Sequence, residues 1–168
     1  MQTIRLGRTD LVTGRIGLGL EHLEKAPYEE VASTVDAALD AGVSYMDLFM
    51  PTPGVRDNMG RLMKGRRDRF QIQGHIGACL QEDGQYCRLR DPEKAERHVE
   101  DLLRRLGTDY VDTLMLHFVD EPDEWAEVAA PGGTLELAQR WKREGKCRAV
   151  GMSSHKVGVS MAAVHSGL

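Results

Sequence analysis

Short apolar runs alternate with longer segments of helical periodicity along most of the chain. Each run has the length of a strand, and between the runs apolar residues recur at the spacing of a helix that buries one face. The predicted strands are residues 15–20, 43–48, 70–74, 110–117 and 147–153. The predicted helices are residues 28–42, 55–65, 91–107, 134–146 and 155–168. The pattern therefore predicts five consecutive β-then-α units.

Capping and turn residues support these boundaries. The helix at residues 91–107 begins with Asp91 as its N-cap and Pro92 at its first position, and ends at Gly107. Before the first unit, residues 3–14 have the pattern of a β-hairpin with its turn near residues 7–10.

Consecutive β-then-α units imply parallel strands with right-handed crossovers, either in a doubly wound sheet or in a (β/α)8 barrel. The repeat alone does not choose between them. A (β/α)8 barrel takes about 250 residues, whereas the last helical segment ends at Leu168, where a sixth strand would begin. Five units would leave two strand edges open to self-association. We expect the missing units to belong to a longer protein rather than to a partner chain.

Composition and charge narrow the classes of function. The chain has 168 residues, of which 41% are hydrophobic and 29% charged, and its net charge is −4. This balance fits one globular domain and offers no uniform field that would attract nucleic acid or an anionic membrane. The N-terminal residues lack an apolar signal segment, and no apolar run approaches the ~18 residues of a membrane span. We therefore expect a cytoplasmic protein without a nucleic-acid or membrane partner.

The three cysteines are Cys79, Cys87 and Cys147. An odd number without a CxxC pair argues against a disulfide framework or a zinc site. We therefore expect reduced thiols.

Polar side chains stand at the end of each predicted strand. Because the active site of a (β/α)8 barrel is built at the C-terminal ends of its strands, this placement predicts a functional site. Strand alternation directs Tyr45 and Asp47 to the inner side of the sheet, and Thr113, Met115 and His117 likewise. The strand-end residues are Glu21, His22, Asp47, His75, His117, Ser153, Ser154 and His155.

Other interpretations of these residues stay open. Asp47 also suits a loop or capping carboxylate, and His75 and His117 suit semi-buried structural histidines. For His22 and His155 we favour solvent-facing positions. A ring of carboxylates and imidazoles is also typical of a zinc, iron or manganese site in a metal-dependent hydrolase or lyase, although no HxH or HExxH spacing is present.

Five segments together resemble the aldo-keto reductases: RLGRTDL, AGVSYMD, GRRDRF, LLRRLGTDYVDTLMLH and KREGKCRAVGMSS. They follow one another in order along the whole chain. The resemblance implies a (β/α)8 barrel closed by an N-terminal hairpin, of which about five units are present. Residues 1–168 would be one partial barrel domain, with the hairpin at 1–14 and the units at 15–168. It also implies NADP(H) or NAD(H) as cofactor and a small carbonyl substrate reduced by hydride transfer.

The family's proton-transfer residues are only partly present. Asp47 matches the family's aspartate and His117 its histidine, whereas Thr52 stands in place of the tyrosine and His75 in place of the lysine. By the same resemblance, Ser153 matches a serine that contacts the nicotinamide carboxamide. Ser154 replaces the usual asparagine beside it.

A threonine hydroxyl cannot serve as the acid, because its pKa lies far above that of a phenol, near ~10. Imidazole is a competent acid near neutral pH, with a pKa of about 6.5. We therefore predict that Asp47, His75 and His117 form the catalytic set, with a histidine as proton donor. Tyr45 lies deeper in the barrel and Tyr86 in a loop, so neither is favoured. Because the tyrosine and the lysine are lost, a non-catalytic barrel fragment that binds a nicotinamide cofactor or a partner subunit without turnover stays open as an alternative. The segments IQGHIG, GQYCRLRD and HFVDE resemble a divergent branch in which an iron–sulfur segment often follows the barrel.

Overall fold

The five predicted strands form one parallel sheet. The structure is a computed structural model that describes residues 2–168, so Met1 of the predicted segment 1–14 lies outside the described residues. The strand order is β3-β4-β5-β8-β9, and neighbouring strands are parallel throughout. The strands are β3 (Leu18–Gly19), β4 (Tyr45–Leu48), β5 (Gln71–Ile76), β8 (Val111–Leu116) and β9 (Cys147–Met152).

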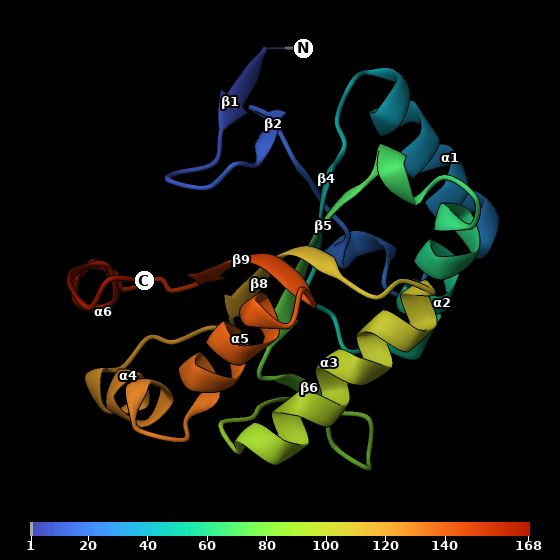
Figure 1. The fold of residues 1–168 in the computed structure, drawn as a ribbon. Helices are drawn as coiled ribbons and strands as arrows, with labels where there is room; N and C mark the ends of the chain where they lie inside the picture. The colour runs from blue at the N-terminus through green and yellow to red at the C-terminus, as the bar shows by residue number, and fades with distance from the viewer. Residues whose placement is uncertain (1) are drawn as a thin grey trace.

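Helices follow the strands, and α1, α2 and α3 lie side by side along the outer face of the sheet (Figure 1). The helices are α1 (Tyr28–Asp40), α2 (Pro53–Met63), α3 (Pro92–Leu106), α4 (Pro122–Ala129), α5 (Thr134–Arg143) and α6 (Val157–His165). Two 3-10 turns, η1 (Glu21–Leu23) and η2 (Arg67–Arg69), complete the helical segments. All were predicted except α4 and the two short turns. None of the helices described for residues 2–168 combines the length and apolar character that a membrane crossing requires.

Strand alternation separates an apolar outer face from a polar inner face. Met46, Ile72 and Leu114 face the helices and are fully buried in the core. A Cβ at Gly74 would lie 2.9 Å from a methyl group of Leu102, so glycine at this position lets α3 approach the sheet closely. On the inner face, the hydroxyl of Tyr45 in β4 bonds to the side chains of Gln73 in β5 and Thr113 in β8. The predicted alternation is confirmed.

The predicted hairpin is present as β1 (Thr3–Arg5) and β2 (Val12–Gly14), which pair antiparallel. Gly7 has a φ of 55°, and the Thr9 hydroxyl donates to the Leu6 carbonyl in the turn. The side chain of Gln71 donates to the Val12 carbonyl at 2.7 Å. Since Gln71 begins β5, the hairpin lies at the N-terminal end of the sheet, away from the polar strand ends (Figure 1).

A second hairpin was not predicted. After β5 the chain forms β6 (Ala78–Leu80) and β7 (Tyr86–Arg88), which pair antiparallel with Cys79 opposite Cys87. Their Cα atoms lie 5.1 Å apart, and the two cysteines form a disulfide. The expectation of reduced thiols is therefore wrong for this pair, because the hairpin brings together two residues that share no recognisable spacing motif. Cys147 is a buried free thiol.

Candidate functional site

Three of the predicted site residues form one chain of hydrogen bonds at the strand ends. His75 Nε2 lies 2.8 Å from Asp47 Oδ1, and His75 Nδ1 lies 2.9 Å from His117 Nδ1. Gln73 also donates to Asp47 Oδ1, at 2.9 Å. The side chains come from β4, β5 and the residue after β8, so the parallel register places them next to one another. Phe49 stacks on His117 with ring centres 5.3 Å apart.

Burial and charge set the protonation of these hydrogen-bonded side chains. The His117 side chain is almost fully buried, and this burial lowers its pKa to about 3. The charges of His75 and Arg90 act in the same direction, against that of Asp47. For Asp47, burial acts to raise the pKa, but hydrogen bonds from His75 and Gln73 outweigh it, so the pKa lies below its ordinary value. At neutral pH, Asp47 is therefore ionised and His117 neutral.

The backbone after β8 is held in an uncommon conformation. Phe118 has a φ of 49°, in the left-handed region that residues with a side chain seldom adopt. Its N–H donates to Ser153 Oγ, and its carbonyl oxygen accepts from Arg90 Nη2, both at 2.8 Å. Arg90 Nη1 donates to the His117 carbonyl, also at 2.8 Å. These bonds offset the cost of the conformation, about 1–3 kcal/mol, and fix the direction of the His117 side chain.

Tyr86 also reaches this site. Its hydroxyl forms a hydrogen bond with His117 Nε2, and its ring meets the ring of Phe49 edge-on at 6.5 Å. The sequence does not favour Tyr86 as a site residue, because residues 76–90 have the pattern of a long loop. The glycines Gly77 and Gly84, which flank β6 and its turn, were the available sign of a hairpin. Both have positive φ, of 99° and 80°.

The remaining strand-end residues lie outside this cluster. Thr52 donates its hydroxyl to the carboxylate of Glu24, so this hydroxyl is engaged away from the cluster. Glu21 and His22 are exposed in η1. His155 is exposed as predicted, and its Nδ1 lies 3.1 Å from Asp120 Oδ2.

The two serines after β9 differ in whether their hydroxyl hydrogen is free to donate to a nicotinamide. Ser153 Oγ accepts the Phe118 N–H, so its own hydroxyl hydrogen is left to donate to a carboxamide oxygen. Ser154 bonds to Asp120 Oδ1 at 3.1 Å and to the backbone of Lys156, which uses its hydroxyl within the loop. The Ser153 hydroxyl is thus free to donate and the Ser154 hydroxyl is engaged in its loop, and nicotinamide binding by either serine stays a prediction.

The metal-site alternative predicts ring nitrogens and carboxylates that converge on one point. Instead, both ring nitrogens of His75 and of His117 are engaged with side-chain neighbours. Within residues 2–168, no three His, Cys, Asp or Glu side chains are arranged to hold a metal ion. The geometry thus favours proton handling over metal binding.

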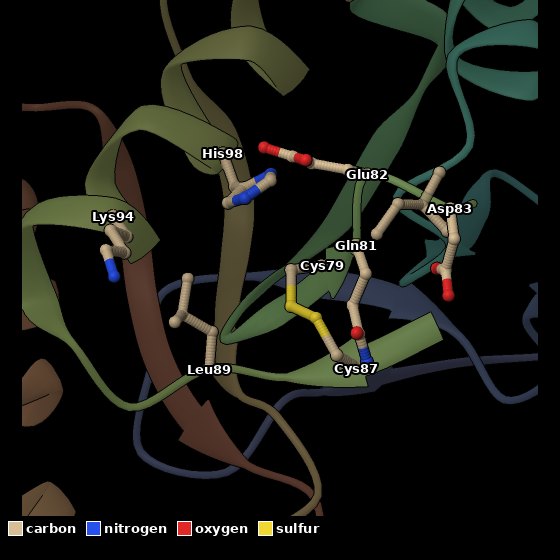
Figure 2. Close-up of a pocket in the computed structure, with 9 residues that line it drawn as sticks. Cys79, Gln81, Glu82, Asp83, Cys87, Leu89, Lys94 and His98 are labelled. Atoms are coloured by element: carbon tan, nitrogen blue, oxygen red, sulfur yellow. A yellow bond between two sulfur atoms is a disulfide. The ribbon is translucent and has the colours of Figure 1, made fainter. Parts of the chain in front are cut away.

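Two cavities lie near the elements that carry the site, and neither is lined by Asp47, His75 or His117. One, of about 950 Å³, lies on the inner face of the sheet, where Tyr45, Gln73 and Thr113 line it together with residues of the β1–β2 turn and α6. Because Gln73 also donates to Asp47, the hydrogen-bonded chain begins at its border. The other, of about 700 Å³, lies between the β6–β7 hairpin and α3, with the disulfide in its wall (Figure 2).

Comparison with known proteins gives a consistent result. The sequence model of the Aldo/keto reductase family matches residues 11–167. Aldo-keto reductase AKR11C1 from Bacillus halodurans, in its holo form, has a TM-score of 0.80 and 27% identity over 92% of this chain and 51% of that chain. The glycerol dehydrogenase AKR11B4 from Gluconobacter oxydans has a TM-score of 0.78 and 23% identity over 98% of this chain and 51% of that chain, a likeness of fold. The predicted (β/α)8-type fold is confirmed.

Two curated relatives are similar in sequence. The NADH-specific methylglyoxal reductase of Escherichia coli (strain K12) is 25% identical over 92% of this chain and 52% of its own length. Aldo-keto reductase YhdN of Bacillus subtilis (strain 168) is 28% identical over 94% of this chain and 48% of its own length. The chain thus spans about half the length of the curated relatives it matches. The comparisons add no support for an iron–sulfur cluster.

Proposed function

Because the chain belongs to the aldo/keto reductase family, we propose that it acts in the nicotinamide-dependent reduction of a small carbonyl compound. The observation that carries the proposal is the chain of hydrogen bonds that joins Asp47, His75 and His117 at the strand ends. In this proposal the histidine pair is the source of the proton. In this chain Thr52 stands where the family has its tyrosine, and His75 stands where it has its lysine. The histidine pair would do the work of those two residues.

The protonation of the pair supports this role. Asp47 is ionised and lies 2.8 Å from His75 Nε2, so its negative charge favours a positive charge on the His75 ring. His117 is buried beside His75 and Arg90, which disfavour a positive charge on its own ring. His75 would therefore store the proton, and His117 would pass it toward the substrate. Asp47, about one third exposed, links the pair to solvent.

A bound dihydronicotinamide would supply the hydride. Among the residues of this chain, Ser153 would hold its carboxamide through the free hydroxyl hydrogen. The Escherichia coli relative is described as NADH-specific and as acting on methylglyoxal, so NADH and methylglyoxal are suitable first probes, with NADPH in parallel. Self-association through the edge strands β3 and β9 stays a prediction from the sequence.

Replacing His117 by phenylalanine tests the proposal. The ring would still stack on Phe49, but no nitrogen would remain to pass a proton, so kcat should fall by about 10²- to 10⁴-fold. Oxidation of NADH or NADPH is followed by absorbance with methylglyoxal as substrate. His165→Phe is the matched control, because His165 is exposed at the end of α6. Full activity of His117→Phe, or no turnover by the wild-type chain with either nucleotide, would contradict the proposal.

A further inference from the structure

Tyr86 extends the hydrogen-bonded chain by one group. It enters from β7, on an element outside the parallel sheet, and its hydroxyl bonds to His117 Nε2. Tyr86 is 45% exposed, so part of its side chain faces solvent beside the buried His117. Phe49 lies edge-on to it and stacks on His117, which gives the phenol an apolar wall on one side.

The hairpin fixes the side of β7 on which Tyr86 lies. Alternation along the strand directs Cys87 toward α3, where it forms the disulfide with Cys79 (Figure 2). Tyr86 and Arg88 point the opposite way, toward His117 and the Phe118 carbonyl. At Gly77 a Cβ would lie 2.9 Å from the Leu89 carbonyl oxygen and 3.9 Å from His117 Cβ. Glycine there allows β7 to pass close to His117.

Asp47 determines the direction of the hydrogen bonds among these side chains as long as both imidazoles are neutral. As a carboxylate it only accepts, so His75 must present Nε2–H to it. When both imidazoles are neutral, His75 Nδ1 accepts from His117 Nδ1–H, and His117 Nε2 accepts the phenol hydrogen of Tyr86. In this state the phenol hydrogen is held by His117 and is not available to a substrate.

A second proton on His75 reverses the outer half of the chain. His75 then donates from both ring nitrogens, so His117 Nδ1 accepts and His117 Nε2 carries the hydrogen. This N–H now donates to the Tyr86 oxygen, which frees the phenol hydrogen to point elsewhere. Burial raises the pKa of Tyr86, against the lowering effect of Arg88 and Arg90, so the phenol keeps its proton at neutral pH.

We propose that Tyr86 is the catalytic residue that donates the proton to the substrate oxygen. His75, through His117, then replaces the proton that Tyr86 has lost. The inference rests on the proposed function. As the carbonyl carbon gains a hydride and forms its new C–H bond, the carbonyl oxygen takes the Tyr86 O–H proton. The phenolate takes the Nε2–H of His117, and His117 Nδ1 takes the proton of His75. The carbonyl is reduced to an alcohol, the hydride donor is oxidised by two electrons, and His75 is left neutral.

Kinetics of Tyr86→Phe test the assignment. Loss of the hydroxyl should lower kcat for methylglyoxal by about 10²- to 10³-fold with little change in KM, because the proton is needed only as the reaction proceeds. The matched control is Tyr110→Phe, which removes a phenol hydroxyl near the start of β8, where the ring faces Arg67. Since Tyr86 and His117 act as a unit, the double variant Tyr86→Phe/His117→Phe should be no slower than His117→Phe alone.

The outcomes separate this inference from the proposed function. If Tyr86→Phe keeps full activity while His117→Phe does not, Tyr86 is not the donor and the reductase proposal stands. If the wild-type chain does not turn over, both fail. Imidazole nitrogen NMR gives a readout that needs no turnover: Tyr86→Phe should shift the Nε2 resonance of His117, and Tyr110→Phe should not. An unchanged Nε2 resonance in Tyr86→Phe would also overturn the inference.

Discussion

Asp47→Asn is expected to lower kcat by about 10²- to 10³-fold while the fold is retained. The asparagine amide has nearly the same shape, but it carries no charge to hold a second proton on His75, 2.8 Å away. Its NH₂ group can also present a donor to His75 Nε2, which would reverse the tautomers along the chain. Hydride transfer from NADH or NADPH to methylglyoxal, followed by nucleotide absorbance, measures the effect.

Asp68→Asn is the matched control for this substitution, because Asp68 is an exposed carboxylate in η2. It should leave kcat unchanged. Activity of Asp47→Asn within twofold of wild type would show that the charge at the end of β4 has no part in the reaction.

Asp112→Ala is expected to destabilise the fold by about 3–5 kcal/mol, the scale for breaking a buried ion pair. The Asp112 side chain is only 3% exposed. Its carboxylate accepts from the Ile72 N–H at 2.8 Å, from Arg67 at 3.0 Å and from Arg148 at 3.1 Å. Alanine would leave the N–H and both guanidinium groups without this partner. Since the free energy of unfolding of a small domain is about 5–15 kcal/mol, this loss is a large fraction of the total stability.

Urea unfolding followed by circular dichroism measures this loss as a shift of the midpoint. Asp112→Asn keeps one acceptor oxygen for the Ile72 N–H and should cost less than alanine. Asp109→Ala, at an exposed position of the preceding turn, should change the free energy of unfolding by no more than about 0.5 kcal/mol. If Asp112→Ala lowered the free energy of unfolding by no more than Asp109→Ala does, the role assigned to Asp112 would be contradicted.

The sheet and most of the site were predictable because they depend on local periodicity. Alternation in β4 and β8 alone places Asp47 and Met46 on opposite faces, and likewise Thr113 and Leu114, so the inner polar set follows from the strands. Parallel pairing then brings the strand ends together. The contact between His75 and His117 follows from β5 and β8 being neighbours, and that neighbour relation follows from the order of the β-then-α units.

Tyr86 and the disulfide were not predictable in the same way. They depend on a short hairpin inserted after β5, whose strands have three residues each and carry too little alternation to be recognised. The hairpin register decides that Cys79 meets Cys87 and that Tyr86 faces His117. The engagement of Thr52 with Glu24 is likewise a contact between two loops that periodicity does not describe.

The central claim is that Asp47, His75, His117 and Tyr86 act as one hydrogen-bonded chain. The most direct measurement is a pH titration of the imidazole nitrogens of the two histidines by NMR in the 168-residue chain. Since the pKa of His117 lies at about 3, its ring should stay neutral well below pH 6.5. It should also exchange its Nδ1–H form for the Nε2–H form as His75 gains its second proton. Two histidines that each titrate independently near pH ~6.5, with no change of tautomer in His117, would contradict the account.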